Sequence, residues 1–246
     1  MTSNNLFNKH TLIFLLVGIV FVGLMLFVEI HNGRFWLNDF KVMYSAADAL
    51  VNDEQVYGLS FGLSTGFYKY SPFTLLLFVP ASLLIFKTAS IIHFIFIGLS
   101  ALSVILILEK LIRSYFKPTR KKTYFSLLAV LLCVVIHLVR DLHLGNINMI
   151  LVLALTLVLY YSLNNKPILA GILLALTVLA KPYFLICILP LLVHKKYKAA
   201  VSTIAGIFIC VVLVFIILPD QSSHLFQDWF SAMLDHNTYL GSSQNR

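Results

Sequence analysis

Charged residues are scarce in this chain of 246 residues, in which Asp, Glu, Lys and Arg together make up 11%. A soluble domain carries about 25% of such residues. Hydrophobic residues make up 60%, and several apolar runs approach the roughly 20 residues that cross a bilayer. The shortage of charge excludes a soluble globular domain. The composition predicts an all-α polytopic membrane protein, organised as a single membrane domain over residues 1–246.

Cysteine is also rare, and the three residues Cys133, Cys187 and Cys210 all fall inside apolar runs. Because they lie in apolar runs, they are expected to be packed thiols. Their spacing matches no metal site. The sequence has no glycine-rich phosphate loop, no cluster of metal-ligating residues and no Ser, His and Asp order typical of hydrolases. These patterns predict neither a metal site nor a cofactor.

The net charge of +8 comes from lysines and arginines in short loops between apolar runs. Such cations set the topology of a membrane protein and contact anionic lipids. Membrane lipids, and not nucleic acid, are therefore the expected partners of this charge. The first apolar run lacks a small-residue cleavage site and exceeds the length of a signal peptide's apolar region, so we expect a retained span.

Apolar runs divide the chain into a first span at 11–30, an outward loop with juxtamembrane helices at 31–88, further spans over 89–218 and an outward polar tail at 219–246. Within 89–218 the spans are expected at 89–108, 124–139, 149–163, 167–180, 183–193 and 199–218.

A topology conflict arises if the run Pro72–Phe86 also crosses the membrane. The six cations between Lys110 and Lys122 would then face outward, against the positive-inside rule. Because this run is short and contains Pro80, we expect it to lie at the outer face without crossing. About seven spans then remain, with the loops Asn164–Lys166 and His194–Lys198 on the cytoplasmic side.

Asp39 lies just after the first span, at the start of a predicted amphipathic helix that begins near Asn38. It is either a first-turn acid that stabilises the helix dipole or a general base at the membrane surface. The two roles are compatible if Asn38 is the helix cap.

Tyr68, Lys69, Tyr70, Ser71 and Pro72 form a second polar cluster. One interpretation is an interfacial aromatic belt with a snorkelling lysine. The other is a hydroxyl-rich floor that binds a sugar or a phosphate.

A third cluster contains Arg140, Asp141, His143, Asn146 and Asn148, with Gly145 as a helix cap between two spans. His143 is a candidate proton carrier or phosphate ligand, and the alternative is a solvent-facing turn with an Arg140–Asp141 pair. Two further histidines, at 93 and 137, lie on apolar runs and are expected to be hydrogen-bonded packing residues.

Lys181, followed by Pro182, interrupts an apolar stretch. A lysine near the centre of a span costs about 2.5–3.5 kcal/mol on insertion scales, so an intramembrane cation predicts a functional site. Here it would neutralise a lipid-linked phosphate, unless it marks a span end and snorkels. We expect one of the two short runs beside Lys181 to be broken or tilted.

These motifs together resemble a known family. Asn38-Asp39-Phe40, Tyr44, Ala46-Ala47, Tyr57 and Tyr70-Ser71-Pro72-Phe73 are similar to the DF…Y.AA…Y…YPPF pattern of glycosyltransferase family 87, which comprises C-type, polyprenol-phosphate-mannose-dependent mannosyltransferases. His143 to Asn148 is similar to that family's GQ.N stretch, and Ala170-Gly171 through Lys181-Pro182 to its AG…KP segment. Two positions depart from the pattern: Ser71 stands for a proline and Asn146 for a glutamine.

The resemblance implies a C-type bundle of about seven transmembrane helices with juxtamembrane helices in the first outward loop. It implies transfer of a mannose-like hexose, with inversion, from a polyprenyl-phosphate donor to a lipid or glycan acceptor at the outer, periplasmic face of the cytoplasmic membrane. The donor is a substrate, and no cofactor is expected. Family members are longer, so a truncated or minimal chain is expected.

Residue roles also follow from the resemblance. Asp39 is expected to be the general base, and Lys181 and His143 to neutralise the leaving phosphate, with Lys69 or Arg140 in reserve. The remaining expected substrate-binding residues are Tyr44, Tyr68, Tyr70, Asp141, Asn146 and Asn148.

Two other classes of function stay open. A transporter or flippase would use Lys181 and the Arg140–Asn148 segment between broken helices, and an internal repeat would favour it, but no convincing repeat is present. A non-catalytic membrane subunit of a longer glycosyltransferase is favoured by the short chain.

Overall fold

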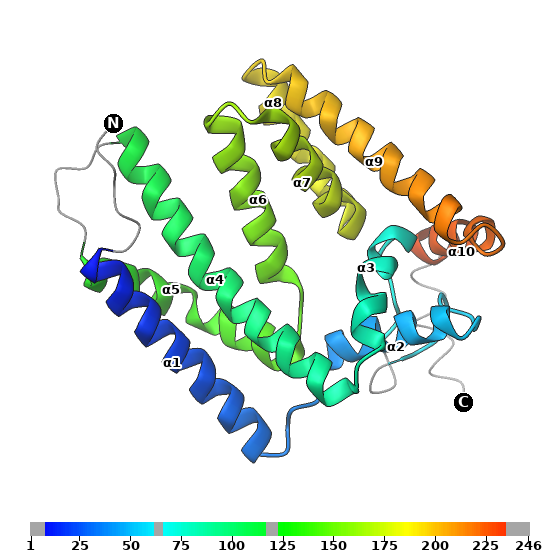
Figure 1. Ribbon diagram of the computed structural model, residues 1–246, viewed down its shortest axis with the longest axis horizontal. Helices are drawn as coiled ribbons and strands as arrows, with labels where there is room; N and C mark the ends of the chain where they lie inside the picture. The colour runs from blue at the N-terminus through cyan, green and yellow to red at the C-terminus, as the bar shows by residue number, and fades with distance from the viewer. Residues whose placement is uncertain (1–7, 62–65, 117–122, 235–246) are drawn as a thin grey trace. The chain divides into compact units, whose positions relative to one another are not determined.

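The computed structural model describes residues 8–61, 66–116 and 123–234, and these are almost entirely helical (Figure 1). The chain divides into two compact units, each described here by itself. Unit 1 comprises Met1–Leu37 and Ile91–Thr156, and unit 2 comprises Asn38–Ser90 and Leu157–Arg246. Among the described residues, four helices are long and apolar enough to cross a bilayer. The protein is therefore a multi-pass, all-α integral membrane protein, as the composition predicts.

Unit 1 is built on three of these long helices: α1 (Lys9–His31), α4 (Phe86–Phe116) and α5 (Tyr124–Leu144). Glycines let α1 and α4 approach closely, because a Cβ added at Gly18 would lie 2.5 Å from Leu102 and one at Gly98 would lie 2.7 Å from Val22. This pairing makes α1 and α4 antiparallel. The loop between them therefore begins and ends at the same end of unit 1, as the predicted topology requires.

Helix α5 runs parallel to α1 within unit 1. The rings of His10 and Tyr124 stack at 5.9 Å near the start of both helices, and His143 contacts Glu29 near their ends. Helix α6 (Asn148–Leu163) follows α5 after a short turn. Consequently the start of α1, the end of α4 and the start of α5 share one end of the unit.

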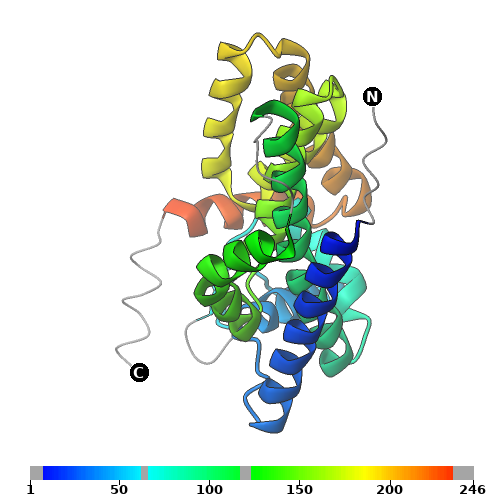
Figure 2. The same cartoon turned by 90° about the vertical axis from the view of Figure 1, so that its left-hand side faces the viewer.

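Unit 2 contains a helical hairpin and the fourth long helix. The hairpin consists of helix α7 (Pro167–Ala180), which leads at Lys181 into the 3-10 helix η1 (Pro182–Cys187), and of α8 (Ile188–Val193), which continues η1. Helix α9 (Tyr197–Ile217) then runs parallel to α7. Figures 1 and 2 both show this return through η1 and α8 before α9 begins. The predicted break beside Lys181 is confirmed, because the run after it changes from 3-10 to α-helix.

Small residues bring α7 and α9 into backbone contact. A Cβ added at Gly171 would lie 2.4 Å from the Cβ of Ser202 and 2.6 Å from the carbonyl oxygen of Ala199. One turn further along, a Cβ at Gly206 would lie 2.9 Å from the Cβ of Ala175. Both helices thus carry small residues four positions apart at their interface, which is the usual way for helices to associate in lipid.

The rest of unit 2 gathers at the end of the hairpin that carries Lys181. It consists of α2 (Asn38–Val51), α3 (Pro72–Ser82) and α10 (Ser222–Leu234). Helix α3 contacts α2, α7, α9 and α10. Its 11 residues span about 16 Å, too short to cross a hydrocarbon core of about 30 Å.

Two sequence-based boundaries were wrong, and one helix was missed. Helix α4 continues to Phe116, so Glu109, Lys110 and Arg113 lie on a helix and not in a loop. Helix α5 continues to Leu144, which shortens the predicted turn to three residues. The tail, predicted only as polar, contains α10. The other four cations of the predicted basic loop, Lys117, Arg120, Lys121 and Lys122, lie outside the described residues.

Candidate functional site

The predicted site residues are divided between the two units. Unit 2 contains Asp39, Tyr44, Lys181 and the segment 68–70, whereas unit 1 contains the segment 140–148. Each group is therefore a local arrangement with its own geometry.

Asp39 lies in the first turn of α2, which begins at Asn38. Asn38 is thus the first residue of the helix. A first-turn carboxylate is stabilised by the partial positive charge of the helix N-terminus. The side chain of Asp39 is half-buried. Its neighbour Phe40 is buried and stacks on Phe86 at 6.1 Å, which fixes the start of α2.

Tyr44 ties α2 to the turn that follows α3. Its hydroxyl donates a hydrogen bond of 2.7 Å to the carbonyl oxygen of Leu84, and its ring meets Phe86 edge-on at 5.2 Å. The hydroxyl proton is therefore used within the protein. A contact with sugar is left to the oxygen lone pairs of Tyr44.

Three tyrosines build the segment that leads into α3. The ring of Tyr68 lies 5.7 Å from that of Tyr57 and 5.6 Å from that of Tyr70. The hydroxyl of Tyr57 donates to the carbonyl oxygen of Tyr70 at 2.8 Å, and that of Tyr68 donates to the carbonyl oxygen of Ser71 at 3.4 Å. Burial raises the pKa of Tyr57 well above its ordinary value, and the Asp228 carboxylate adds to this effect.

Tyr68 is only 1% exposed, and burial, aided by Tyr57 and Tyr70, raises its pKa as well. The expectation that Tyr68 touches the sugar does not fit this position, because its ring and hydroxyl face the protein. Tyr70 is half-buried and Lys69 is exposed. Of the three, Tyr70 and Lys69 are accessible to a substrate.

Helix α10 contacts the segment that leads into α3, and the sequence analysis did not predict this helix. The indole Nε1 of Trp229 donates to the carbonyl oxygen of Lys69 at 3.2 Å, and Gln221 donates to the carboxylate of Asp53. Apolar residues at positions 225, 226, 229, 230 and 233 show the spacing of an amphipathic helix, which was the available signal.

Lys181 lies at the apex of the hairpin, between α7 and η1, and is half-buried. Two residues earlier, the carbonyl oxygen of Leu179 accepts a backbone hydrogen bond of 3.4 Å from Ser71. Ser71 also caps α3, where its hydroxyl oxygen accepts from the backbone N–H of Thr74 at 3.3 Å. The Tyr70-Ser71-Pro72 and Lys181-Pro182 motifs, more than a hundred residues apart in sequence, are thus brought together.

Asp39 and Lys181 are linked to α3 through different contacts. Phe40, next to Asp39, contacts Phe78 on α3 and Phe86, the first residue of α4. Leu179, two residues before Lys181, contacts Ser71, which caps the N-terminal end of α3. Both candidate residues therefore lie next to residues that contact α3 or its cap.

Hydrogen bonds within the polar turn of unit 1 fix its conformation. Asp141 is 5% exposed, and its Oδ1 accepts from the side-chain amide of Asn148 at 3.3 Å. Asn146 Oδ1 accepts from the backbone N–H of Asn148 at 3.2 Å, and Gly145 takes the left-handed conformation (φ 69°) that the predicted cap requires. His93 Nε2 lies 3.0 Å from the carbonyl oxygen of Gly145, which confirms its expected role as a hydrogen-bonded packing residue.

His143 and Arg140 lie on the last turns of α5, and both are exposed. The Nδ1 atom of His143 lies 3.1 Å from both carboxylate oxygens of Glu29, which sequence reasoning missed. A lone acid at the end of an apolar span was the signal for Glu29. The pairing leaves Nε2 of His143 as the nitrogen that would meet a phosphate or a proton.

No group of three His, Cys, Asp or Glu side chains that could hold a metal ion is found among the described residues. The fold and these clusters define a polytopic helical membrane protein in which the Tyr70-Ser71-Pro72 and Lys181-Pro182 motifs meet at the apex of a hairpin in unit 2.

The chain belongs to glycosyltransferase family 87, whose model matches residues 67–245. This match includes the motifs of Tyr70 and Lys181, while Asp39 and Tyr44 precede it. The chain is also 27% identical over 200 residues to an α-(1→3)-arabinofuranosyltransferase of Corynebacterium glutamicum. The aligned part covers 81% of this chain and 47% of that protein, so the chain spans about half the length of this curated relative. No solved structure matches the chain.

Proposed function

We propose that the chain is a membrane glycosyltransferase that moves a sugar from a polyprenyl-phosphate donor to a lipid or glycan acceptor. The observation that carries the proposal is the Ser71–Leu179 contact, which joins the two motifs at the hairpin apex. Both motifs lie within the residues that match the family. Membership supports the reaction class, and the contact supports a common site for the motifs.

Lys181 binds the donor phosphate in this proposal. Lys181 is half-buried where α7 meets η1, two segments that consist mainly of apolar residues. Attraction between a cation and a phosphate is stronger in such surroundings than in water. Stabilisation of the leaving phosphate lowers the barrier to its departure. Tyr70, on the neighbouring motif, contacts the sugar.

Asp39 acts as the general base. Its carboxylate takes the proton of an acceptor hydroxyl while the hydroxyl oxygen forms a bond to the anomeric carbon. The bond between that carbon and the phosphate oxygen breaks on the opposite face, the polyprenyl phosphate leaves with the electron pair, and the configuration inverts. In this proposal the acceptor hydroxyl lies at Asp39 and the donor phosphate at Lys181, with the anomeric carbon between them.

The sugar is a mannose-like hexose or a pentose. The YSPF and KP motifs resemble those of mannosyltransferases, whereas the curated relative is named for arabinofuranose transfer. Donors of both kinds therefore belong in the first assay.

The reaction takes place at the outer face of the cytoplasmic membrane. In unit 2, the loops 164–166 and 194–196 lie together, since Lys196 Nζ donates to Asn165 Oδ1 at 3.3 Å. Three lysines in these two loops mark the cytoplasmic end by the positive-inside rule. Lys181 lies at the other end of α7, which is the outward end.

One rival function, a transporter, has specific support, because the broken helix beside Lys181 is a feature of transporters. A transporter would move the donor across a vesicle without transferring the sugar. A non-catalytic subunit would do neither.

Replacement of Asp39 by Asn tests the base assignment. The amide keeps the size of the side chain but cannot accept a proton, so we expect the transfer rate to fall by about 10²–10⁴-fold. Asp48→Asn is the matched control, because Asp48 is exposed on the same helix. Sugar transfer is measured with the full chain in vesicles that contain the lipid-linked donor. Equal rates for wild type and Asp39→Asn would remove Asp39 from the reaction.

A further inference from the structure

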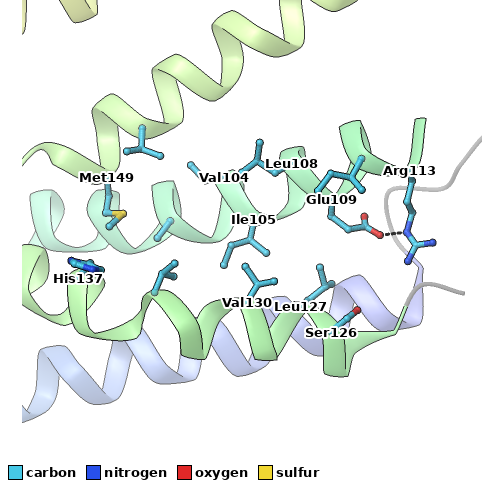
Figure 3. Close-up of a pocket in the computed structure, with 14 residues that line it drawn as sticks. Val104, Ile105, Leu108, Glu109, Arg113, Ser126, Leu127, Val130, His137 and Met149 are labelled. Atoms are coloured by element: carbon cyan, nitrogen blue, oxygen red, sulfur yellow. Dashed lines mark hydrogen bonds and ion pairs between the residues drawn. The ribbon is translucent and has the colours of Figure 1, made fainter. Parts of the chain in front are cut away.

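Unit 1 contains a groove between α4, α5 and the start of α6, with a volume of about 490 Å³. This volume lies within the range of small-molecule sites. Its walls are mainly aliphatic (Figure 3). Apolar side chains from all three helices line it, among them Ile112 on α4, Val130 on α5 and Met149 on α6.

The position of the groove favours a hydrocarbon occupant. Helices α4 and α5 are both candidate membrane spans, so the groove lies at the depth of the bilayer. Val130 and Ile112 line it and are 47% and 51% exposed, which shows that it opens sideways. Apolar cavities exclude water and accept apolar molecules. A lipid chain can therefore enter from the membrane.

One end of the groove is charged. Glu109 and Arg113 form an ion pair there, with Ser126 opposite them on α5, whereas His137 and Met149 lie toward the other end (Figure 3). The planar guanidinium group of arginine suits a phosphate, because it donates parallel hydrogen bonds. A groove with an aliphatic body and an arginine at its end matches the chemistry of an anionic lipid.

The charged end also identifies the leaflet. It lies at the start of α5, where the start of α1 brings Lys9 and the end of α4 brings Lys110. Cations of this kind mark the cytoplasmic face, where anionic phospholipids attract them. The turn at Gly145 lies at the opposite end of α5.

We propose that this groove binds one acyl chain of an anionic phospholipid of the cytoplasmic leaflet, with the phosphate at Arg113. The site is separate from the donor site of the proposed function, because the donor phosphate belongs at the outward face. The lipid fills the gap between α4 and α5 and holds the two helices at a fixed spacing.

The test uses the full chain in phosphatidylcholine vesicles that contain phosphatidylglycerol with a photoactivatable acyl chain. We expect cross-links on the groove-lining residues of α4 and α5. Val130→Trp fills the groove and should abolish these cross-links. Leu132→Trp, on the same helix but outside the groove and 69% exposed, should leave them unchanged. Equal labelling of both variants would overturn the proposal.

A second experiment tests the headgroup, because misfolding of Val130→Trp would also abolish the cross-links. Wild type should label more strongly with the phosphatidylglycerol probe than with a phosphatidylcholine probe of the same chain. Arg113→Gln should reduce this preference by about tenfold, as expected for the loss of one charge-assisted phosphate contact, and Arg113→Lys should keep part of it. Equal labelling by the two probes in wild type would show an unspecific lipid contact and contradict the proposal.

Discussion

At the scale of single residues, the aromatic side chains around the unit 2 site act mainly as supports. Tyr44, Tyr57, Tyr68 and Trp229 each donate a hydrogen bond to a main-chain carbonyl oxygen of a neighbouring segment. A donor used in this way fixes the backbone of the segments that connect the helices. The side chains left for chemistry are therefore the charged ones, above all Lys181, together with the accessible ring of Tyr70.

Tyr57→Phe measures this support directly. At neutral pH the variant loses the hydrogen bond to the carbonyl oxygen of Tyr70, so we expect a loss of about 1 kcal/mol in stability. The thermal unfolding midpoint in detergent is the measurement. Wild type measured at the same pH is the reference for each value.

The stability difference between wild type and Tyr57→Phe should depend on pH. Because the pKa of Tyr57 is raised in the folded protein, the unfolded chain loses this proton first, near its ordinary pKa of 10. The contribution of Tyr57 to stability is thus complete below about pH 10 and is lost as the pH rises further. Above that pH, the midpoint of wild type should fall more steeply than that of Tyr57→Phe. Parallel curves would contradict the burial of this hydroxyl.

At the scale of elements, the sequence predicted helices best where local signals mark both ends. Helix α7 has the predicted bounds, since Pro167 starts it and Lys181-Pro182 stops it. The start of α3 was also predictable, because Ser71 and Pro72 form a cap and a first turn. The end of α4 was not, since the Glu109–Arg113 pair one turn apart supports the helix where the charges alone suggested a loop.

The candidate site was predictable only in part, for a similar reason. The motifs of Tyr70 and Lys181 were visible in the sequence, but their meeting depends on a backbone contact between Ser71 and Leu179. The partnership of His143 with Glu29 likewise joins two helices far apart in sequence. Such pairings follow from tertiary packing, which one sequence does not reveal.

The interface of α7 and α9 gives a prediction at this scale. Gly171→Ala places a Cβ 2.4 Å from Ser202, next to backbone that cannot move easily, so we expect a loss of about 1–3 kcal/mol. Gly23→Ala is the matched control, because no atom lies within 4 Å of the added Cβ. The control should keep or raise the unfolding midpoint, since alanine favours helices. A stable Gly171→Ala protein would contradict the close contact.

At the scale of the whole molecule, each unit has one basic end and an opposite end that carries its polar motifs. In unit 1, Lys9 and Arg113 lie at one end and the Gly145 turn at the other; in unit 2, the lysines of the loops 164–166 and 194–198 lie at the end opposite Lys181. By the positive-inside rule, the basic end of each unit is expected on the cytoplasmic side, which agrees with the proposed reaction at the outer face.

The central claim is that this chain itself transfers a sugar, although it spans about half the length of its curated relative. The most direct measurement is the incubation of the purified chain, in vesicles, with polyprenyl-phosphate donors that carry labelled mannose or arabinose, together with a lipid or glycan acceptor. The account predicts labelled acceptor and free polyprenyl phosphate in equal amounts. Donor that crosses the vesicle membrane intact, or that stays unchanged with every acceptor, would contradict it.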